Sequence, residues 1–271
     1  MTPVPRPFGL TVVIPHFDRP QLLRRAVDSV RTRSETPVEV IVVDDASPSD
    51  PRSVFGPTNA HGVPMRHYRL PRNSGPQTAR NLGIRRAAYR FIAFLDSDDI
   101  FLPEKIDAVI PHLQDDSVDL LFHDAEGMEV SSRISRLWHR HGSWLPLRCL
   151  LALVNPIATP TLVVRRRHVL GVPGMRHTED WAYLIRYCEG QTRVRYLPQT
   201  LTSVQRPQGS KGGLSQARWR MRRGEFAAHR LLLRRLRPNN MALAMLGAAV
   251  SVLRVGSDLL RGRIWPTRGA P

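Results

Sequence analysis

The sequence predicts an α/β protein with a mostly parallel sheet and helices on both faces. A wholly apolar run at 91–95 and mainly apolar runs at 11–14 and 38–43 are too short for helices and are typical of strands buried on both faces. A helical pattern between such strands requires right-handed crossovers, which bring the loops after the strands to one edge of the sheet. With 271 residues, 42% of them hydrophobic, the chain can form one large domain with appendages.

The first strand leads into a polar turn at Pro15–Pro20, and apolar residues then recur through 21–30 at the spacing of an amphipathic helix. The second strand, 38–43, ends at two aspartates, and 65–70 is a candidate third strand. A polar loop before Pro76 leads into a further helix, because proline is favoured in a first helical turn.

The strand at 91–95 stops at three carboxylates, Asp96, Asp98 and Asp99. Ligands bind α/β sheets at this carboxyl edge, and crowded like charges there indicate a bound cation. A hard divalent cation bridging to phosphate oxygens fits the position, and an acidic cap or turn is the alternative. The turn at 15–20, the second strand's end at Asp45 and the helix bearing Arg80 are expected at the same rim.

At this point the chain resembles bacterial family 2 glycosyltransferases of GT-A fold. Residues 13–18 (VIPHFD) resemble the family's opening VIPTYN, and 42–47 (VVDDAS) resemble its VVDDGS. Asn73-Ser74-Gly75 with 79–81 (ARN) and 95–99 (LDSDD) follow in the family's order, as do 178–181 (TEDW). The resemblance covers residues 10–205, close over the first hundred and looser afterwards.

The resemblance implies a Rossmann-like GT-A domain that binds a nucleoside-diphosphate sugar, a UDP-sugar being the first expectation. The residues it assigns to the nucleotide sugar are Pro15, Phe17, Asp18, Asp45, Asn73, Arg80, Asp96, Ser97 and Asp98. Asp98 and Asp99 would hold Mn²⁺ or Mg²⁺, which suit carboxylate and phosphate oxygens. His16 and Asp18 differ from the family's usual small hydroxyl residue and asparagine, so base preference stays open.

Two of these residues have plain structural alternatives. Phe17 would pack against the base, or it would simply fill the core. Arg80 would reach the base or phosphates as a forked donor, or it would be a solvated helical arginine. The residues alone leave both alternatives open.

For the acceptor half, the resemblance implies a hexosyltransferase whose general base is Asp180, which deprotonates an acceptor hydroxyl in a single-displacement, inverting reaction. Asp180 opens a helical run, so helix capping is the alternative. Glu179 would support the site, and Trp181 would be an acceptor platform or a core residue. The expected pathway is surface polysaccharide or glycolipid assembly, with lipid-linked acceptors included.

The sequence divides into a lead-in at 1–9, a GT-A domain at 10–205 with donor (10–100) and acceptor (101–205) halves, and a basic extension at 206–271. Much of the net charge of +17 lies in 206–237, and an apolar stretch at 241–253 follows. A basic helix before a short apolar one suits an anionic membrane surface, and a helical hairpin packed on the domain is the alternative. Arg206 and Lys211 are candidate phosphate ligands in a closing loop.

Other features limit the remaining classes of protein. Cys149 and Cys188 are the only cysteines, and no signal peptide opens the sequence, which favours a cytoplasmic protein that is peripheral on the inner face of the plasma membrane. A nucleotidyltransferase would want a glycine-rich basic loop after its first strand, which 15–20 does not offer. A nucleic-acid-binding module would explain the charge but not the acidic strand ends, so no nucleic acid is expected. Oligomeric state stays open.

Overall fold

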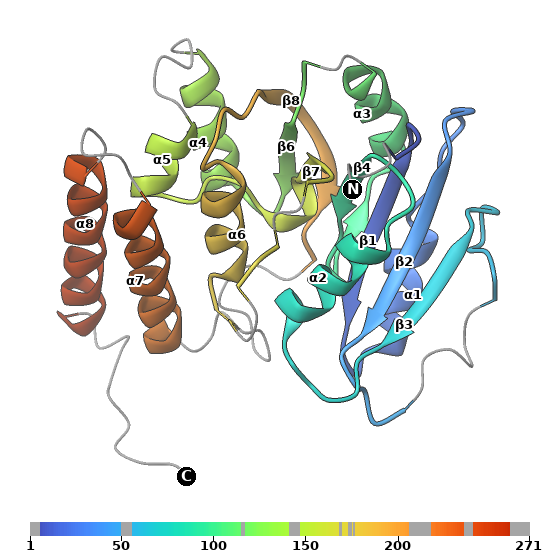
Figure 1. Cartoon of the computed structure of the whole chain (residues 1–271), viewed down its shortest axis with the longest axis horizontal. Helices are drawn as coiled ribbons and strands as arrows, with labels where there is room; N and C mark the ends of the chain where they lie inside the picture. The colour runs from blue at the N-terminus through green and yellow to red at the C-terminus, as the bar shows by residue number, and fades with distance from the viewer. Residues whose placement is uncertain are drawn as a thin grey trace, which may run out of the picture.

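The structure is a computed structural model, and it describes residues 6–49, 56–114, 117–140, 147–167, 170–172, 175, 177–205, 218–235 and 241–260. Within these residues one eight-stranded sheet has the order β3-β2-β1-β4-β7-β6-β8-β5 (Figure 1). The strands are β1 (Leu10–His16), β2 (Val38–Asp44), β3 (Met65–Arg69), β4 (Phe91–Phe94), β5 (Ile100–Phe101), β6 (Leu120–Glu126), β7 (Val163–Arg165) and β8 (Val194–Ser203).

The strands that carry the predicted site are parallel to one another. β1 pairs in parallel with β2 and β4, and β2 pairs in parallel with β3. The short β7 is antiparallel to both β4 and β6, and β5 is antiparallel to β8. The predicted mostly parallel, mixed sheet is therefore confirmed, and the carboxyl ends of β1, β2 and β4 share one edge.

Helices cover both faces of the sheet (Figure 1). The helices are α1 (Pro20–Asp28), α2 (Pro76–Arg86), α3 (Lys105–Leu113), α4 (Glu129–Arg140), α5 (Leu147–Leu153), α6 (Glu179–Tyr187), α7 (Arg218–Arg235) and α8 (Met241–Leu260). One buried cluster joins α1 and α3 to the sheet, and a second joins α5 and α6 to its other face. Burial of these two clusters is the main stabilising contribution to the fold.

Helix α2 packs directly on β1 because it has a glycine at the point of contact. A Cβ atom on Gly83 would lie 2.4 Å from Cγ1 of Val13, which is too close for any side chain. The helix begins at Pro76, as predicted, directly after the loop at the carboxyl edge. This close approach brings Arg80 to the acidic end of β4.

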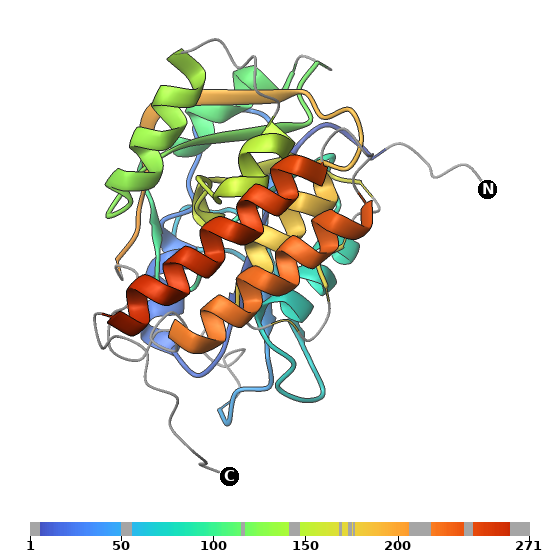
Figure 2. The ribbon, with the colours of Figure 1, turned by 90° about the vertical axis from the view of Figure 1, so that its left-hand side faces the viewer.

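The two C-terminal helices lie side by side (Figures 1 and 2). Helix α7 contacts α6, and α8 contacts α5 and α7, so the predicted alternative of a packed helical hairpin matches the structure. The apolar stretch at 241–253 forms the larger part of α8, which continues past Arg254 to Leu260. Among the described helices, none has the length and apolar character needed to cross a bilayer.

Helix α8 exposes four large apolar side chains and buries two polar ones. Its outer face, defined here as Met245, Leu246, Val252 and Leu253, is 52–72% exposed. The buried positions include Ser251, whose hydroxyl donates to Glu225, and Asp258, which accepts two hydrogen bonds from Arg222. This distribution is the reverse of that in a helix packed on a water-soluble core.

Candidate active site

Asp45 joins the loops that follow β1 and β2 to the start of α2. Its backbone N–H donates to the carbonyl of His16 at 2.8 Å. Its buried carboxylate accepts the N–H groups of Ser74 at 2.7 Å and Gly75 at 2.8 Å. Asp45 therefore fixes the turn from which α2 begins.

The loop after β1 presents an aromatic side chain to solvent. Phe17 is 44% exposed, so the alternative that it fills the core is wrong. Asp18 has a left-handed backbone with φ of 51°, and its N–H donates to Oγ of Ser47 at 2.8 Å. The adjoining Pro15 is buried within β1. The ring of Phe17 is thus held outward at the rim and is accessible to a planar ligand.

The acidic turn after β4 is the most negatively charged part of this rim. Asp98 pairs with Arg19 at 2.9 Å. Asp99 is 5% exposed and accepts the N–H of Gln205 at 3.1 Å. Burial and the neighbouring charges of Asp96 and Asp98 raise the pKa of Asp99 to about 8. Negative charge is therefore only partly compensated by the protein's own cations.

These carboxylates are oxygen ligands of the kind that divalent metals prefer, although few of them lie together. Over the described parts of the chain, no cluster of three or more histidine, cysteine or acidic side chains is arranged to hold a metal. Mg²⁺ is commonly bound by one or two carboxylates together with substrate phosphates, so a larger protein cluster is not required. The oxygen donors and the raised pKa of Asp99 fit such an ion.

Arg80 connects the acidic turn to helix α6. Its guanidinium donates to Asp96 at 2.5 Å and to Glu179 at 3.1 Å. Arg80 is 6% exposed, so the alternative of a solvated helical arginine is wrong. Burial lowers the pKa of Arg80, but the two carboxylates raise it by a larger amount. Arg80 therefore stays positively charged. Burial raises the pKa of Glu179 to about 7, an effect that Arg80 opposes.

Asp180 lies one residue inside α6, so it is not the helix cap. The helix begins at Glu179, Thr178 is the N-cap residue, and no side chain caps this end. Asn155 donates to Oδ2 of Asp180 at 3.1 Å, and its own carbonyl oxygen accepts the N–H of Ile157. Burial raises the pKa of Asp180. Asn155, which lies outside α6, therefore helps to orient this carboxylate.

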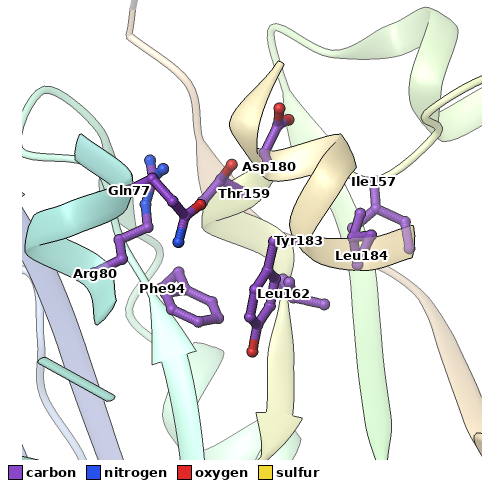
Figure 3. A pocket seen from close by; sticks show the side chains of 9 residues that line it. All are labelled: Gln77, Arg80, Phe94, Ile157, Thr159, Leu162, Asp180, Tyr183 and Leu184. Atoms are coloured by element: carbon purple, nitrogen blue, oxygen red, sulfur yellow. The ribbon is translucent and has the colours of Figure 1, made fainter. Parts of the chain in front are cut away.

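Asp180 lines two cavities, one on each side of its helix. The smaller, of about 10 Å³, lies between α2, β4 and α6 and is lined by Gln77, Arg80, Phe94 and Tyr183 among others (Figure 3). Its volume is close to that of one water molecule. The larger, of about 500 Å³, lies between α4, α6, α7 and α8. Asp180 thus stands between the acidic rim and a cavity of ligand size.

Comparison with known proteins identifies the domain that carries this geometry. Residues 11–171 match the family profile described as Glycosyl transferase family 2. The chain belongs to glycosyl transferase family 2. An uncharacterised glycosyltransferase of Rickettsia felis is 27% identical over 156 residues, covering 57% of this chain and 25% of the relative. The succinoglycan biosynthesis protein ExoO of Rhizobium meliloti is 32% identical over 133 residues, covering 45% and 37%. The chain thus matches about a quarter to a third of the length of these relatives.

Solved structures place this family 2 chain in the GT-A fold. The crystal structure of Staphylococcus aureus TarS 1–349 in complex with UDP-GlcNAc matches 92% of this chain and 73% of its own, with a TM-score of 0.65 and 16% identity. The mannosyltransferase PcManGT of Pyrobaculum calidifontis, in complex with GDP-Man and Mn²⁺, matches 98% and 83%, with a TM-score of 0.61 and 17% identity. Both likenesses concern the fold.

The remaining predicted site residues fall into three groups. Ser97 is buried in the acidic turn, whereas Asn73 is exposed in the loop before α2. Trp181 is 4% exposed and donates to the carbonyl of Leu151, so it is a core residue and not an open acceptor platform. Arg206 and Lys211 lie outside the described residues.

Sequence reasoning gave no role to Asn155 or Arg19, which contact the predicted site residues. The side-chain oxygen of Asn155 accepts the N–H of Ile157 two residues later, a local turn that asparagine commonly forms, so asparagine before Pro156 was the available signal. Arg19 directly follows Asp18 at the exit of β1, so a basic residue beside a predicted acidic rim was the available signal. The contacts of both residues join segments far apart in the chain.

Proposed function

We propose that the chain transfers a sugar from a nucleoside-diphosphate donor, a UDP-sugar first, to a hydroxyl acceptor with inversion at the anomeric carbon. The observation that carries the proposal is the position of Asp180. On one side, Arg80 links its helix to Asp96 of the acidic rim, and on the other side lies the cavity of about 500 Å³. A donor on one side and an acceptor on the other would then meet at this carboxylate. Membership of family 2 supports the reaction class.

In the proposed reaction, Asp180 takes the proton of the acceptor hydroxyl. The hydroxyl oxygen forms a bond to the anomeric carbon as the bond from that carbon to the diphosphate oxygen breaks. Burial raises the pKa of Asp180, which makes its carboxylate a stronger base than that of an exposed aspartate. Asn155 would orient the carboxylate, and Glu179 would support it through Arg80.

On the donor side, Phe17 would pack on the base, with Pro15, Asp18, Asp45 and Asn73 forming its slot. Asp96 and Ser97 would bind the ribose, and Arg80 would keep Asp96 in place. Asp98 and Asp99 would hold Mn²⁺ or Mg²⁺. When bound, the metal supplies positive charge that neutralises the leaving diphosphate.

The proposed setting is surface polysaccharide or glycolipid assembly at the inner face of the plasma membrane. The name of the relative ExoO, a succinoglycan biosynthesis protein, supports polysaccharide assembly. We also propose the division into a donor half at 10–100, an acceptor half at 101–205 and a C-terminal extension at 206–271. Helices α7 and α8 of that extension pack on α5 and α6 of the acceptor half, which supports a role in the acceptor site.

We propose in addition that the outer face of α8 contacts an anionic membrane. Four large apolar side chains on this face are exposed, and no described segment packs over them. The net charge of +17 and the exposed Arg220 and Arg223 on the neighbouring α7 complement anionic lipid headgroups. An interfacial helix of this kind needs an apolar face and nearby basic residues.

The test is a panel of nucleotide sugars titrated into the full chain by calorimetry with Mn²⁺, followed by product analysis with a hydroxyl acceptor. We expect one nucleoside-diphosphate sugar to bind more tightly than its nucleoside monophosphate, and its sugar to appear on the acceptor with inverted configuration. Binding of a nucleoside triphosphate with release of pyrophosphate would instead support the alternative of a nucleotidyltransferase. Binding of neither donor class would leave only a non-catalytic basic protein.

A further inference from the structure

About half of the residues that line the large cavity beside Asp180 come from helices that follow the family-matched region. Helices α7 and α8 supply Met221, Arg222, Arg254 and Ser257 to its wall, and α4 supplies Val130 and Ile134. The family profile ends at residue 171, so α7 and α8 lie beyond the residues that match it. The match to the profile therefore does not specify this part of the wall.

Helix α7 approaches the start of α6 closely enough to enclose Asp180. A Cβ atom on Gly224 would lie 2.3 Å from Oγ1 of Thr178 and 2.7 Å from the carbonyl oxygen of His177. Only glycine permits this approach without displacing backbone. It places Met221, one turn before Gly224, and Glu225, directly after it, in the wall of the cavity that Asp180 also lines.

On the polar side of the cavity, Arg222 forms ion pairs with two carboxylates. Arg222 donates to Asp258 at 2.7 and 2.9 Å and to Glu225 at 2.7 Å. Both carboxylates are less than 10% exposed, so this cluster is a fixed, internally paired part of the wall. Together with Arg254, which lines the same cavity, the cluster offers several hydrogen-bonding groups, and these favour a polar ligand such as a sugar at this end.

The opposite side is apolar and open. Val130 and Ile134 lie one turn apart on α4, and Met221 of α7 lines the same cavity. Val130 is 72% exposed, so apolar surface continues from the cavity to solvent. A free sugar would leave this surface uncovered, whereas an attached alkyl chain would remove it from water.

We infer that this cavity is the acceptor subsite and that its acceptor bears an apolar group next to the sugar that carries the reactive hydroxyl. The inference rests on the proposed function and specifies its substrate class. The sugar lies between Asp180 and the Arg222 cluster, and the apolar group follows α4 and α7 toward the mouth of the cavity. An alkyl glycoside is the simplest molecule with this chemistry.

The test compares methyl and n-octyl β-glucoside binding to the full chain by calorimetry, below the micelle concentration of the octyl compound. We expect the octyl glycoside to bind at least tenfold more tightly, because several methylene groups are buried. Val130→Asp and Met221→Asp should each reduce this preference at least fivefold. Val130 is exposed, so its substitution does not depend on the core tolerating a charge.

The matched control is Leu253→Asp on the outer face of α8, because Leu253 and Val130 are both 72% exposed. Leu253→Asp should leave the octyl preference unchanged. Equal binding of the two glycosides, or loss of the preference in Leu253→Asp but not in Val130→Asp, would overturn the inference. Nucleotide-sugar binding measured on the same samples reports separately on the proposed function, because it depends on the donor rim.

Discussion

Arg80 of α2 and Glu179 of α6 form an ion pair of 3.1 Å across 99 positions of the chain. The same guanidinium binds Asp96, so one buried cation connects the donor rim to the helix of Asp180. The arrangement gives the two proposed half-sites a common rigid support. Its geometry implies that a change on one side is transmitted to the other.

Arg80→Met is expected to destabilise the fold by about 3–5 kcal/mol, because two buried carboxylates lose their partner. Glu179→Gln in the Arg80→Met background should recover part of that loss, since one uncompensated charge is removed. Urea unfolding of the two single variants and the double variant measures the coupling. Arg24→Ala, which breaks an exposed pair with Asp28, is the control and should cost less than about 1 kcal/mol. Additive losses in the double variant would contradict a shared support.

Donor binding should require a divalent metal held at Asp98 and Asp99. We expect the affinity for a nucleoside diphosphate, measured by calorimetry, to fall at least tenfold when Mn²⁺ is replaced by chelator. Asp98→Asn should abolish most of the metal-dependent part, because a carboxylate ligand is lost. Asp28→Asn, far from the acidic turn in sequence and paired with Arg24, serves as the control. Equal affinity with and without metal would remove Asp98 and Asp99 from this role.

Asp180→Asn should separate chemistry from donor binding. The substitution preserves size, and we expect donor affinity within about threefold of the parent with transfer reduced by about a hundredfold or more. Asn155→Ala should reduce transfer less, about tenfold, because it frees the carboxylate to turn without removing it. Product formation at a series of pH values is the measurement. Near-parental transfer by Asp180→Asn would move the search for the base to Glu179.

The buried Asp119 should make stability depend on pH in the acid range. Hydrogen bonds from Arg193 and Arg167 lower its pKa to about 2, against the effect of burial. A lowered folded-state pKa contributes stability that is present above the unfolded value near 4 and is lost as the pH falls toward 2. Asp119→Asn should therefore cost about 2 kcal/mol at pH 7 and little at pH 2. Urea unfolding at both pH values, with the exposed Glu35→Gln as control, tests the sign.

Anionic vesicles should sediment the full chain at low salt and release it as salt rises, because surface attraction is screened. Leu246→Asp with Leu253→Asp should weaken sedimentation at least fivefold, since both residues lie on the outer face of α8. Leu137→Asp on α4, where Leu137 is 59% exposed, is the control. If the double variant instead turns a dimer into a monomer with unchanged sedimentation, the face binds a second copy.

The sequence predicts the donor half of the sheet well because its signals are local. Phe91–Leu95 is wholly apolar and ends in carboxylates, and Pro76 starts its helix as expected. Burial of Arg80 could not be predicted, because its partners lie 16 and 99 positions away. A helical pattern was present at Val130, Ile134 and Leu137, but these residues carry no chemistry and gave no indication of a cavity.

Helix α8 shows a different limit of sequence reasoning. Its apolar residues predict a helix, and amphipathic patterning would turn them inward. In the structure Ser251 and Asp258 face inward because Glu225 and Arg222 on α7 require partners in a buried position. Pairing between two C-terminal helices therefore decides the orientation, and composition alone does not.

The acidic turn also has a consequence for the order in which the protein matures. Asp99 accepts the amide of Gln205, 106 positions later in the chain, and Phe101 pairs with Thr202 of β8. A ribosome releases the N-terminal half first, so the turn leaves the exit tunnel well before these two contacts can form. During synthesis the parallel strands can assemble early, while the acidic turn acquires its final support only after residue 205 has emerged.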